Sequence, residues 1–450
     1  MLSLVRAAPA RAHRLALRLS SAFSSTAATS NIANPWDCTA VREAWDFKRD
    51  GGAFDFRALA HDDNNTENGT TASTSSTASS ARTSAKAFFD AHGFVVLTNL
   101  MSEAENTAAV AALVADLHEV NPSTSHITDP ALFPEEALPT SPNRTFRTTC
   151  NMAFGRFSWF VRGHAGVRDA FVMLHGMDSE EGGGGGGGGD AEAAGGLACS
   201  WDNPFYTPAG GTELLAGGGC TELHWDHNWY YAGEKAPMAD ELCVQGVYYA
   251  RPTDYTTPTF ICVPKSTRAW RDVFSESRHN PSKYGARVLN YLPLSEFEGK
   301  EENDGDGEEV VPASGLGRPV RIHVPARGLL LWNSRTCHGN TAAVAAPPLE
   351  ESSSGGGGEG EEEGDGGGGG GGGRVAFAIC YGPVEHRTAA VQKEALLKGL
   401  SGIRTTHHPG IMLAHDQHGY PEGFVGEGKR EMRRSRKRGV GEGGDQSVPW

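Results

Sequence analysis

The stretch TELHWDHNWYY, residues 221–231, combines a strand-like run with two potential metal ligands, His224 and Asp226. Residues two apart on a β-strand point to the same side, so a strand here would present both side chains together. Two imidazoles and one carboxylate on one face of a mononuclear iron leave its other positions open for a chelating cosubstrate and dioxygen. The motif alone is weakly specific, because His61 and Asp63 repeat it in a polar segment.

A third potential ligand follows downstream in GLLLWNSRTCHGN, residues 328–340. His338 comes just after the apolar run, where it can reach a metal held by the first motif. Farther on, Arg374 opens the apolar run RVAFAICYGP. An arginine there can bind a carboxylate in a bidentate pair, which suits the distal carboxylate of 2-oxoglutarate. The alternative is that Arg374 only caps a strand or lies in an acidic surface network, and Arg335 is then the leading candidate to bind the carboxylate.

The polar residues near these motifs each have two interpretations. Gln245 and Asn340 are candidates to hydrogen-bond the cosubstrate, and a plain structural role is the alternative. Cys337 is expected to be a buried neutral thiol and not a thiolate ligand. His227 should point away from the two ligands of its strand, because side chains alternate.

Short runs of β-branched and aromatic residues, bounded by Gly, Pro and Asp, recur along the chain. This spacing favours a sandwich or barrel over alternating β-α units. We therefore predict a mainly β fold, a double-stranded β-helix (jelly roll, cupin-like) with N-terminal α-helices packed on its outside. Helices are expected at 84–92 and about 102–119, and strands at 93–100, 197–201, 221–231, 241–250, 258–264, 320–325, 328–334 and 374–383.

Low-complexity segments interrupt the chain. Residues 62–83 are too polar to bury a core and indicate a linker. Three long insertions are flanked by apolar sequence and indicate expanded surface loops, near 179–196, 298–314 and 349–373. The expected organisation is a transit peptide over 1–36, an N-terminal extension and polar linker over 37–83, one domain over 84–390, and a C-terminal extension with a basic, disordered tail over 391–450.

Composition excludes several classes of protein. The formal net charge of −15 argues against a protein that coats nucleic acid, and most of that charge lies in two of the insertions. No run approaches the roughly 18 to 20 apolar residues that a membrane span needs. The eight cysteines include no C-x-x-C pair, which fits reduced thiols inside a cell.

The N-terminal composition indicates an organelle address. The first thirty residues contain four arginines and many Ser and Ala, and no acid precedes Asp37. This composition is typical of a transit peptide. We expect a mitochondrial location, with a plastid or cytoplasmic location as alternatives.

The order of HWDHN, CVQGVYYA, PTFICVP, GLLLWNSRTCHGN and RVAFAICYGP resembles the phytanoyl-CoA dioxygenase-like family of Fe(II)- and 2-oxoglutarate-dependent oxygenases. The resemblance covers about 84–390 apart from the insertions, and it includes KAFFDAHGFVVLTNLMSEAE and GRFSWFVRGHAGVRDAFVMLHGM. It implies that His224, Asp226 and His338 bind iron, with no catalytic residue beyond these ligands, and that Arg374 binds the 2-oxoglutarate carboxylate. The segment DYTTPTFICVPKSTRAW departs from the Gly-rich turn usual in the family, which bears on substrate specificity.

The resemblance implies a dioxygenase that uses Fe(II), 2-oxoglutarate and O2 to hydroxylate a small-molecule or acyl substrate, with release of succinate and CO2. Asp226 favours hydroxylation, because halogenating relatives have a small residue at that position. A catalytically silent jelly roll that binds a ligand or partner is the alternative. A zinc hydrolase is less favoured, because the sequence contains no H-E-x-x-H motif. No motif selects a particular substrate or an oligomeric state.

Overall fold

The computed structural model describes residues 41, 43–60, 75–133, 152–177, 196–207, 221–225, 242–270, 290–291, 316–341 and 373–384. The chain divides into two units, Met1–Pro35 and Trp36–Trp450, and every described residue lies in the second. Asp226 and His227 lie outside the described residues, as do residues 1–36, for which a transit peptide is predicted, residues 391–450 and almost all of the three insertions.

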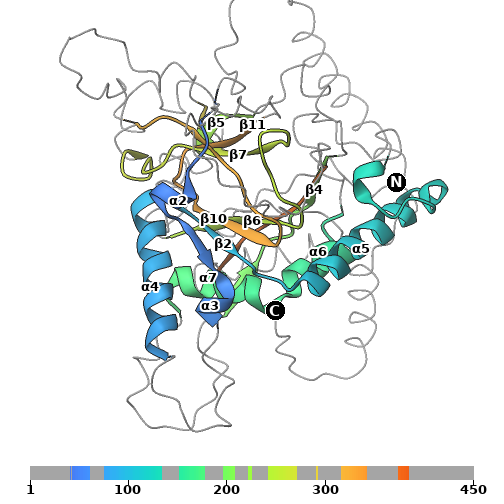
Figure 1. Cartoon of the computed structure of the whole chain (residues 1–450), viewed down its shortest axis with the longest axis horizontal. Helices are drawn as coiled ribbons and strands as arrows, with labels where there is room; N and C mark the ends of the chain where they lie inside the picture. The colour runs from blue at the N-terminus through green and yellow to red at the C-terminus, as the bar shows by residue number, and fades with distance from the viewer. Residues whose placement is uncertain are drawn as a thin grey trace, which may run out of the picture. The chain divides into compact units, whose positions relative to one another are not determined.

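Within the described residues, the strands form two main sheets, and Figure 1 shows β5, β7 and β11 stacked over β2, β6 and β10. The larger sheet has the order β1-β2-β10-β6-β12-β4. Strand β1 pairs parallel with β2, and the other neighbours pair antiparallel, so this sheet is mixed. Its strands are β1 (Ala53–Asp55), β2 (Phe94–Thr98), β10 (Gly328–Asn333), β6 (Val244–Tyr249), β12 (Arg374–Ile379) and β4 (Pro204–Thr207).

The smaller main sheet is antiparallel throughout and has the order β8-β5-β11-β7-β9. Its strands are β8 (Asn290–Tyr291), β5 (Thr221–Trp225), β11 (His338–Thr341), β7 (Thr259–Cys262) and β9 (Val320–Ile322). A separate pair joins β13 (Tyr381–Pro383) to β3 (Leu197–Cys199). The prediction of a sheet-rich fold is therefore confirmed.

The inner faces of the two main sheets share one apolar cluster. Because side chains alternate along a strand, every second residue of β2, β6, β10 and β12 enters this space. Buried side chains of the smaller sheet meet them there, which holds the two sheets face to face. The cluster contains Phe94, Val96, Val247, Tyr249, Leu330, Trp332, Ala376 and Ala378 from the larger sheet, and Phe260, Cys262, Val320 and Ile322 from the smaller one.

The remaining side chains of the larger sheet pack against helices, which lie on its outer face in Figure 1. A capping box starts α5, because the Ser102 hydroxyl accepts from the Glu105 backbone at 3.1 Å and the Glu105 carboxylate accepts from the Ser102 backbone at 2.7 Å. None of the described helices is long and apolar enough to cross a membrane. The helices are α2 (Phe47–Asp50), α3 (Phe56–Ala60), α4 (Ser75–His92), α5 (Glu103–Val120), α6 (Arg156–Gly163) and α7 (Ala165–His175), with 3-10 turns at Pro122–Thr124 and Pro130–Leu132.

Helix α4 begins nine residues before the expected start at 84, inside the segment that composition assigned to a polar linker. Hydroxyls within the helix find local partners, since Thr83 and Ser84 each donate to the carbonyl four residues earlier at 2.9 Å. Arg82 donates to the carbonyl of Leu59 in α3 at 2.7 Å. Packing against α3 thus supports a helix that polar composition alone argues against.

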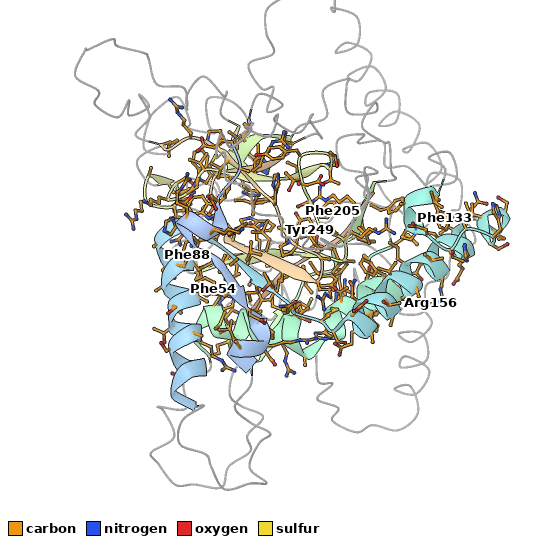
Figure 2. The ribbon with its side chains drawn as sticks, in the orientation of Figure 1. Phe54, Phe88, Phe133, Arg156, Phe205 and Tyr249 are labelled. Carbon is orange, nitrogen blue, oxygen red and sulfur yellow. The ribbon has the colours of Figure 1, made fainter. Side chains whose placement is uncertain are left out.

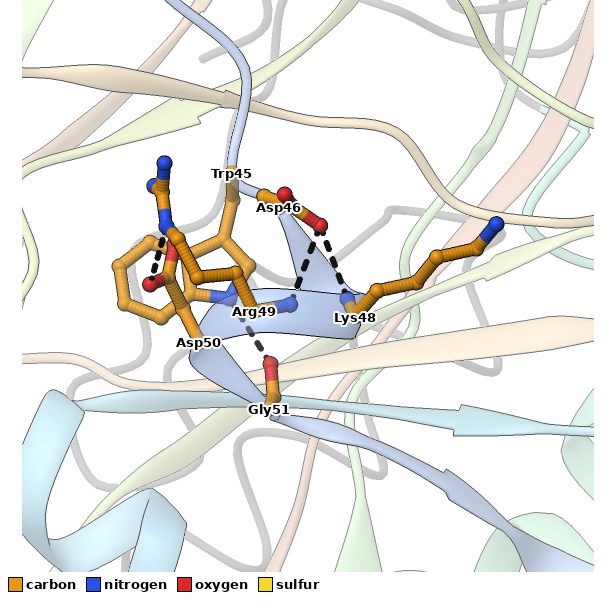
Figure 3. Close-up of polar contacts among 6 residues, drawn as sticks. All are labelled: Trp45, Asp46, Lys48, Arg49, Asp50 and Gly51. Atoms are coloured by element: carbon orange, nitrogen blue, oxygen red, sulfur yellow. Dashed lines mark hydrogen bonds and ion pairs between the residues drawn. The ribbon is translucent and has the colours of Figure 1, made fainter. Parts of the chain in front are cut away.

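The N-terminal arm, residues 43–55, runs from the edge of one main sheet to the edge of the other. At its start, Arg321 of β9 donates its backbone N–H to the Glu43 carbonyl at 2.8 Å and accepts from Trp45 at 2.9 Å. At its end, β1 pairs with β2. Figure 3 shows the turn between them, where the Asp46 carboxylate accepts from two backbone N–H groups and the Trp45 indole donates to the Gly51 carbonyl at 2.9 Å. Backbone pairing at both of its ends therefore makes the arm part of the sandwich.

Candidate metal centre

His224 and His338 form a cross-strand pair at the centre of the candidate site. They are direct partners in the register of β5 and β11, so both side chains leave the sheet on the same face. Their ring centroids lie 4.6 Å apart. Both are buried, with exposed fractions of 8% and 4%. The structure thus brings together two histidines that the sequence separates by more than a hundred residues.

The His338 ring has a fixed orientation. Its Nδ1 lies 2.9 Å from the backbone carbonyl of Thr336, and because a carbonyl only accepts, Nδ1 carries the proton. The ring lone pair that can bind a metal is then on the other nitrogen, Nε2. Metal-binding histidines are commonly held through their second nitrogen in this way. The contact assigns the tautomer that a metal ligand requires.

A tight turn holds Thr336 in place. The Thr336 hydroxyl donates to the Gly93 carbonyl at 2.8 Å, and Asn333 donates its backbone N–H to the same carbonyl at 2.9 Å. Gly93 has φ +83°, and a Cβ there would meet the Thr336 hydroxyl oxygen at 2.5 Å. Glycine is therefore required at this junction of α4 and β2. Neither Gly93 nor Thr336 is marked by any metal-binding motif, so sequence reasoning did not find them.

The two histidines fit an iron centre, because neutral imidazole is a common ligand of iron and other transition metals. Asp226, the expected third ligand, directly follows the last residue of β5 and lies outside the described residues. In the described part of the chain, no group of three His, Cys, Asp or Glu residues is close enough to hold a metal ion. The complete ligand set remains a prediction.

A buried guanidinium occupies the same inter-sheet space. Arg374 begins β12 and is 6% exposed. Its Nη1 donates to the Asn340 side-chain oxygen at 3.2 Å, and its Nη2 donates to the Tyr249 hydroxyl at 3.4 Å. The guanidinium carbon lies 5.3 Å from the ring centre of Phe205 and 5.5 Å from that of Tyr249. Figure 2 labels both rings, which lie together between the two sheets.

Arg374 lacks an anionic partner among the described residues. No described carboxylate forms an ion pair with it, and no described acceptor lies within hydrogen-bonding distance of its Nε. Burial raises the pKa of the Tyr249 phenol above its usual range, with Arg374 opposing that shift, so the hydroxyl stays neutral. An unpaired buried cation is costly. The arrangement is therefore suited to an anionic ligand that completes the pair.

Asn340 connects the guanidinium to the histidine pair. It lies two residues after His338 on the same face of β11, opposite Phe260 of β7 in the register. Two residues along a strand span about 7 Å. Arg374, through its contact with Asn340, thus lies about one strand repeat from His338 on the inner side of the sandwich.

Gln245 lies at the other end of β6 from Tyr249. It is fully buried, and it is the register partner of Trp332 on β10. The structure therefore places Gln245 beside Trp332, while Asn340 lies beside Arg374. The sequence could have indicated Tyr249 as well, because residues 245 and 249 of one strand point to the same face as each other.

Aromatic rings surround His338. The Phe260 ring stacks on it with centroids 5.5 Å apart, and the Trp332 ring lies 5.3 Å away. Cys262 is the register partner of His338 on β7. Burial raises the pKa of the Cys262 thiol above its ordinary range, so it is a neutral thiol beside the histidine. Sequence reasoning did not single out Phe260, Trp332 or Cys262.

Arg335, the alternative residue for binding the carboxylate, and Cys337 do not belong to this group of side chains. Arg335 places its guanidinium 4.9 Å from the ring centre of Trp270. Cys337 joins Trp270 in an apolar cluster on the outer face of the smaller sheet, and burial raises the pKa of its thiol well above the usual value. Cys337 is a buried neutral thiol, as expected.

Comparisons with known proteins give distant structural matches. No family model matches the chain, and no curated protein matches it. The non-heme alpha ketoglutarate dependent carbocyclase SnoK from nogalamycin biosynthesis is 11% identical, with 66% of this chain and 82% of that chain covered at a TM-score of 0.33. EctD from S. alaskensis with 2-oxoglutarate and 5-hydroxyectoine is 15% identical, with 67% and 76% covered at 0.35. AviO1 from Streptomyces viridochromogenes Tue57 is 12% identical, with 67% and 94% covered at 0.33. At these scores, the site rests on its own geometry.

Proposed function

We propose that the protein is an Fe(II)- and 2-oxoglutarate-dependent dioxygenase that hydroxylates a small-molecule or acyl substrate. The observation that carries the proposal is that the buried guanidinium of Arg374, which has no carboxylate partner among the described residues, contacts Asn340 on the strand that holds His338 opposite His224. An imidazole pair suits a catalytic metal, and a buried cation about one strand repeat away suits the distal carboxylate of a chelating cosubstrate. Neither the histidine pair nor the buried guanidinium alone would indicate an oxygenase that uses 2-oxoglutarate.

The proposal assigns a role to each residue. His224, His338 and Asp226 would hold iron, which supplies the dioxygen chemistry that converts 2-oxoglutarate and O2 to succinate and CO2 and the substrate C–H bond to C–OH. Arg374 would bind the distal carboxylate of 2-oxoglutarate, and Tyr249 would add its hydroxyl proton. The side-chain oxygen of Asn340 accepts from Arg374 and so orients it.

The aromatic side chains exclude water from this space. Phe205, Trp332 and Phe260 line it, and the strands around them are buried. Excluding water strengthens the attraction between the guanidinium and a carboxylate. We also propose that the two main sheets form a double-stranded β-helix, which their antiparallel pairing and shared apolar cluster support.

The experiment compares the full chain with His224→Ala. Purified protein is loaded anaerobically with Fe(II), and succinate is measured after 2-oxoglutarate and oxygen are added. We expect slow succinate formation by the unchanged protein and none by the variant. Iron-loaded protein that binds 2-oxoglutarate but gives no more succinate than the variant, with or without candidate substrates, would support the silent jelly roll instead.

We further propose that residues 1–36 direct the chain to mitochondria, which their arginine-rich, acid-free composition supports. A fluorescent protein fused after residue 36 should enter mitochondria, and the same fusion with its four arginines replaced by glutamine should not. Accumulation in plastids or the cytoplasm would contradict this address.

A further inference from the structure

Trp332 carries a buried hydrogen-bond donor with no acceptor among the described residues. The side chain lies on β10, 5% of the residue is exposed, and no acceptor in the described part of the chain lies within hydrogen-bonding distance of its Nε1. Two other indoles find acceptors, since Trp225 donates to the Arg335 carbonyl at 2.9 Å and Trp45 to the Gly51 carbonyl at 2.9 Å, whereas the Trp159 indole in α6 also lacks a described acceptor. A buried donor without a partner costs free energy, so it calls for a ligand or an ordered water.

The Trp332 ring lies inside the candidate site. Its ring centroid is 5.3 Å from that of His338 and 4.7 Å from that of Phe260. Across the ladder it faces Gln245, whose side chain lies on the same inner face of the larger sheet. The unsatisfied N–H therefore belongs to the same inter-sheet space as the histidine pair.

The positions of two side chains on strand β6 show which end of the site lies next to Trp332. Gln245 and Tyr249 lie on one face of this strand, four residues apart, which is about 13 Å. Tyr249 contacts Arg374 at one end, and Trp332 lies opposite Gln245 at the other end. A cosubstrate bound between Arg374 and the histidine pair would fill the Tyr249 end. The Trp332 end remains for a second ligand.

We propose that the Trp332 Nε1–H donates a hydrogen bond to an acceptor oxygen of the primary substrate. This inference rests on the proposed function and names the chemistry of its second ligand. The substrate class carries a carbonyl, carboxylate or hydroxyl oxygen close to the carbon that is presented to the metal. The Trp332 and Phe260 rings require apolar carbons next to that oxygen.

The experiment observes the indole N–H directly. The full chain is labelled with 15N-tryptophan and loaded with Zn(II), which is diamagnetic and inert to oxygen, together with 2-oxoglutarate. The Trp332 indole signal is assigned by its loss in Trp332→Phe, and acetamide serves as the probe of the acceptor subsite. We expect a saturable downfield shift of the Trp332 indole proton with acetamide, no shift with ethylammonium, and no shift at Trp45.

Two binding measurements separate this inference from the proposed function. Trp332→Phe should weaken acetamide binding about tenfold, while its affinity for 2-oxoglutarate stays within about twofold of the unchanged protein. An isosteric benzothienylalanine at position 332, which replaces the N–H by sulfur, should do the same without altering packing. The matched control Trp45→Phe should change neither affinity.

Three outcomes overturn the inference. The first is that acetamide does not shift the Trp332 indole signal. The second is that this signal already shows a hydrogen bond when no ligand is present. The third is that the Trp332 variants lose affinity for 2-oxoglutarate, which would assign the donor to the cosubstrate. Failure of the proposed function looks different. In that case the iron-loaded unchanged protein forms no more succinate than His224→Ala, while acetamide still shifts the Trp332 indole signal.

Discussion

His224 and His338 face each other directly across two antiparallel strands, with ring centroids 4.6 Å apart. Cross-strand partners have fixed separation and direction, so the two imidazoles are held together by backbone pairing before any metal binds. The contact between His338 Nδ1 and the Thr336 carbonyl adds a fixed ring orientation. A preorganised ligand pair of this kind lowers the entropy cost of binding a metal.

Replacing one of the pair should abolish tight metal binding. We expect His338→Ala to reduce the affinity for Fe(II) or Mn(II) by at least about a hundredfold, since loss of a mere supporting contact already costs up to that much. Titration calorimetry on the full chain measures the change. The control is His118→Gln, which alters a histidine of α5 that contacts the Ile127 carbonyl. This variant should bind metal normally. Equal affinities for all three proteins would remove His338 from the site.

Gly93→Ala should weaken both the fold and the site. Alanine would be strained at φ +83°, and its Cβ would collide with the Thr336 hydroxyl that anchors the turn before His338. We expect a loss of about 1–3 kcal/mol in the free energy of unfolding, measured by urea denaturation, together with weaker metal binding. Gly163→Ala is the matched control, because a Cβ there meets no heavy atom within 4 Å. A Gly93→Ala protein as stable as this control would refute the steric argument.

The sequence indicated the strands that consist of a run of apolar, β-branched or aromatic residues. Strands β6, β7, β9, β10 and β12 all lie within predicted ranges. Strand β11, with the sequence HGNT, has no such run, and it forms because β5 and β7 pair with it on both sides. Strand β1 likewise depends on its pairing with β2. Strands β1 and β11 therefore form through pairing with other strands, and a local residue pattern does not reveal that pairing.

The same limit applies to the site. Motif spacing suggested His224, His338 and Arg374, but only the strand register shows that Asn340 is the residue that links Arg374 to His338. Tyr249 looked like a core aromatic residue in the sequence. Its hydroxyl becomes informative only beside the buried guanidinium. Contacts between side chains on different strands thus lay beyond any pattern along the chain.

Arg374→Gln should separate ligand binding from stability. Removing an unpaired buried charge should leave the free energy of unfolding unchanged or raise it, because the guanidinium has no described carboxylate partner. The same change should weaken 2-oxoglutarate binding by more than tenfold, since charge-assisted hydrogen bonds contribute about 1.5–3 kcal/mol. Calorimetry with Zn(II)-loaded protein measures the affinity. As a control, Arg251→Gln removes an arginine that pairs with Asp129 and should leave 2-oxoglutarate binding intact. Unchanged affinity in Arg374→Gln would exclude the proposed carboxylate site.

Asp116 should make stability depend on pH. Its carboxylate is buried between α5 and α6, where it accepts from the Phe157 backbone at 3.1 Å and pairs with Arg156, which Figure 2 labels. Burial raises its pKa from 3.8 to about 6, and the bonds from Arg156 and Phe157 oppose that rise. The folded state therefore holds the proton more tightly than the unfolded state. The contribution of Asp116 to stability is fully present below about pH 4 and is lost as the pH rises through about 6.

Asp116→Asn removes this titration. The free energy of unfolding of the variant, relative to that of the unchanged protein, should increase by up to about 3 kcal/mol between pH 4 and pH 7, because one pKa unit corresponds to about 1.4 kcal/mol. Urea denaturation across this pH range measures the difference. Glu119→Gln, which alters the second carboxylate paired with Arg156, keeps Asp116 and should retain the pH dependence of the unchanged protein. A constant difference between Asp116→Asn and the unchanged protein would mean that the ion pair with Arg156, and not burial, governs the protonation of Asp116.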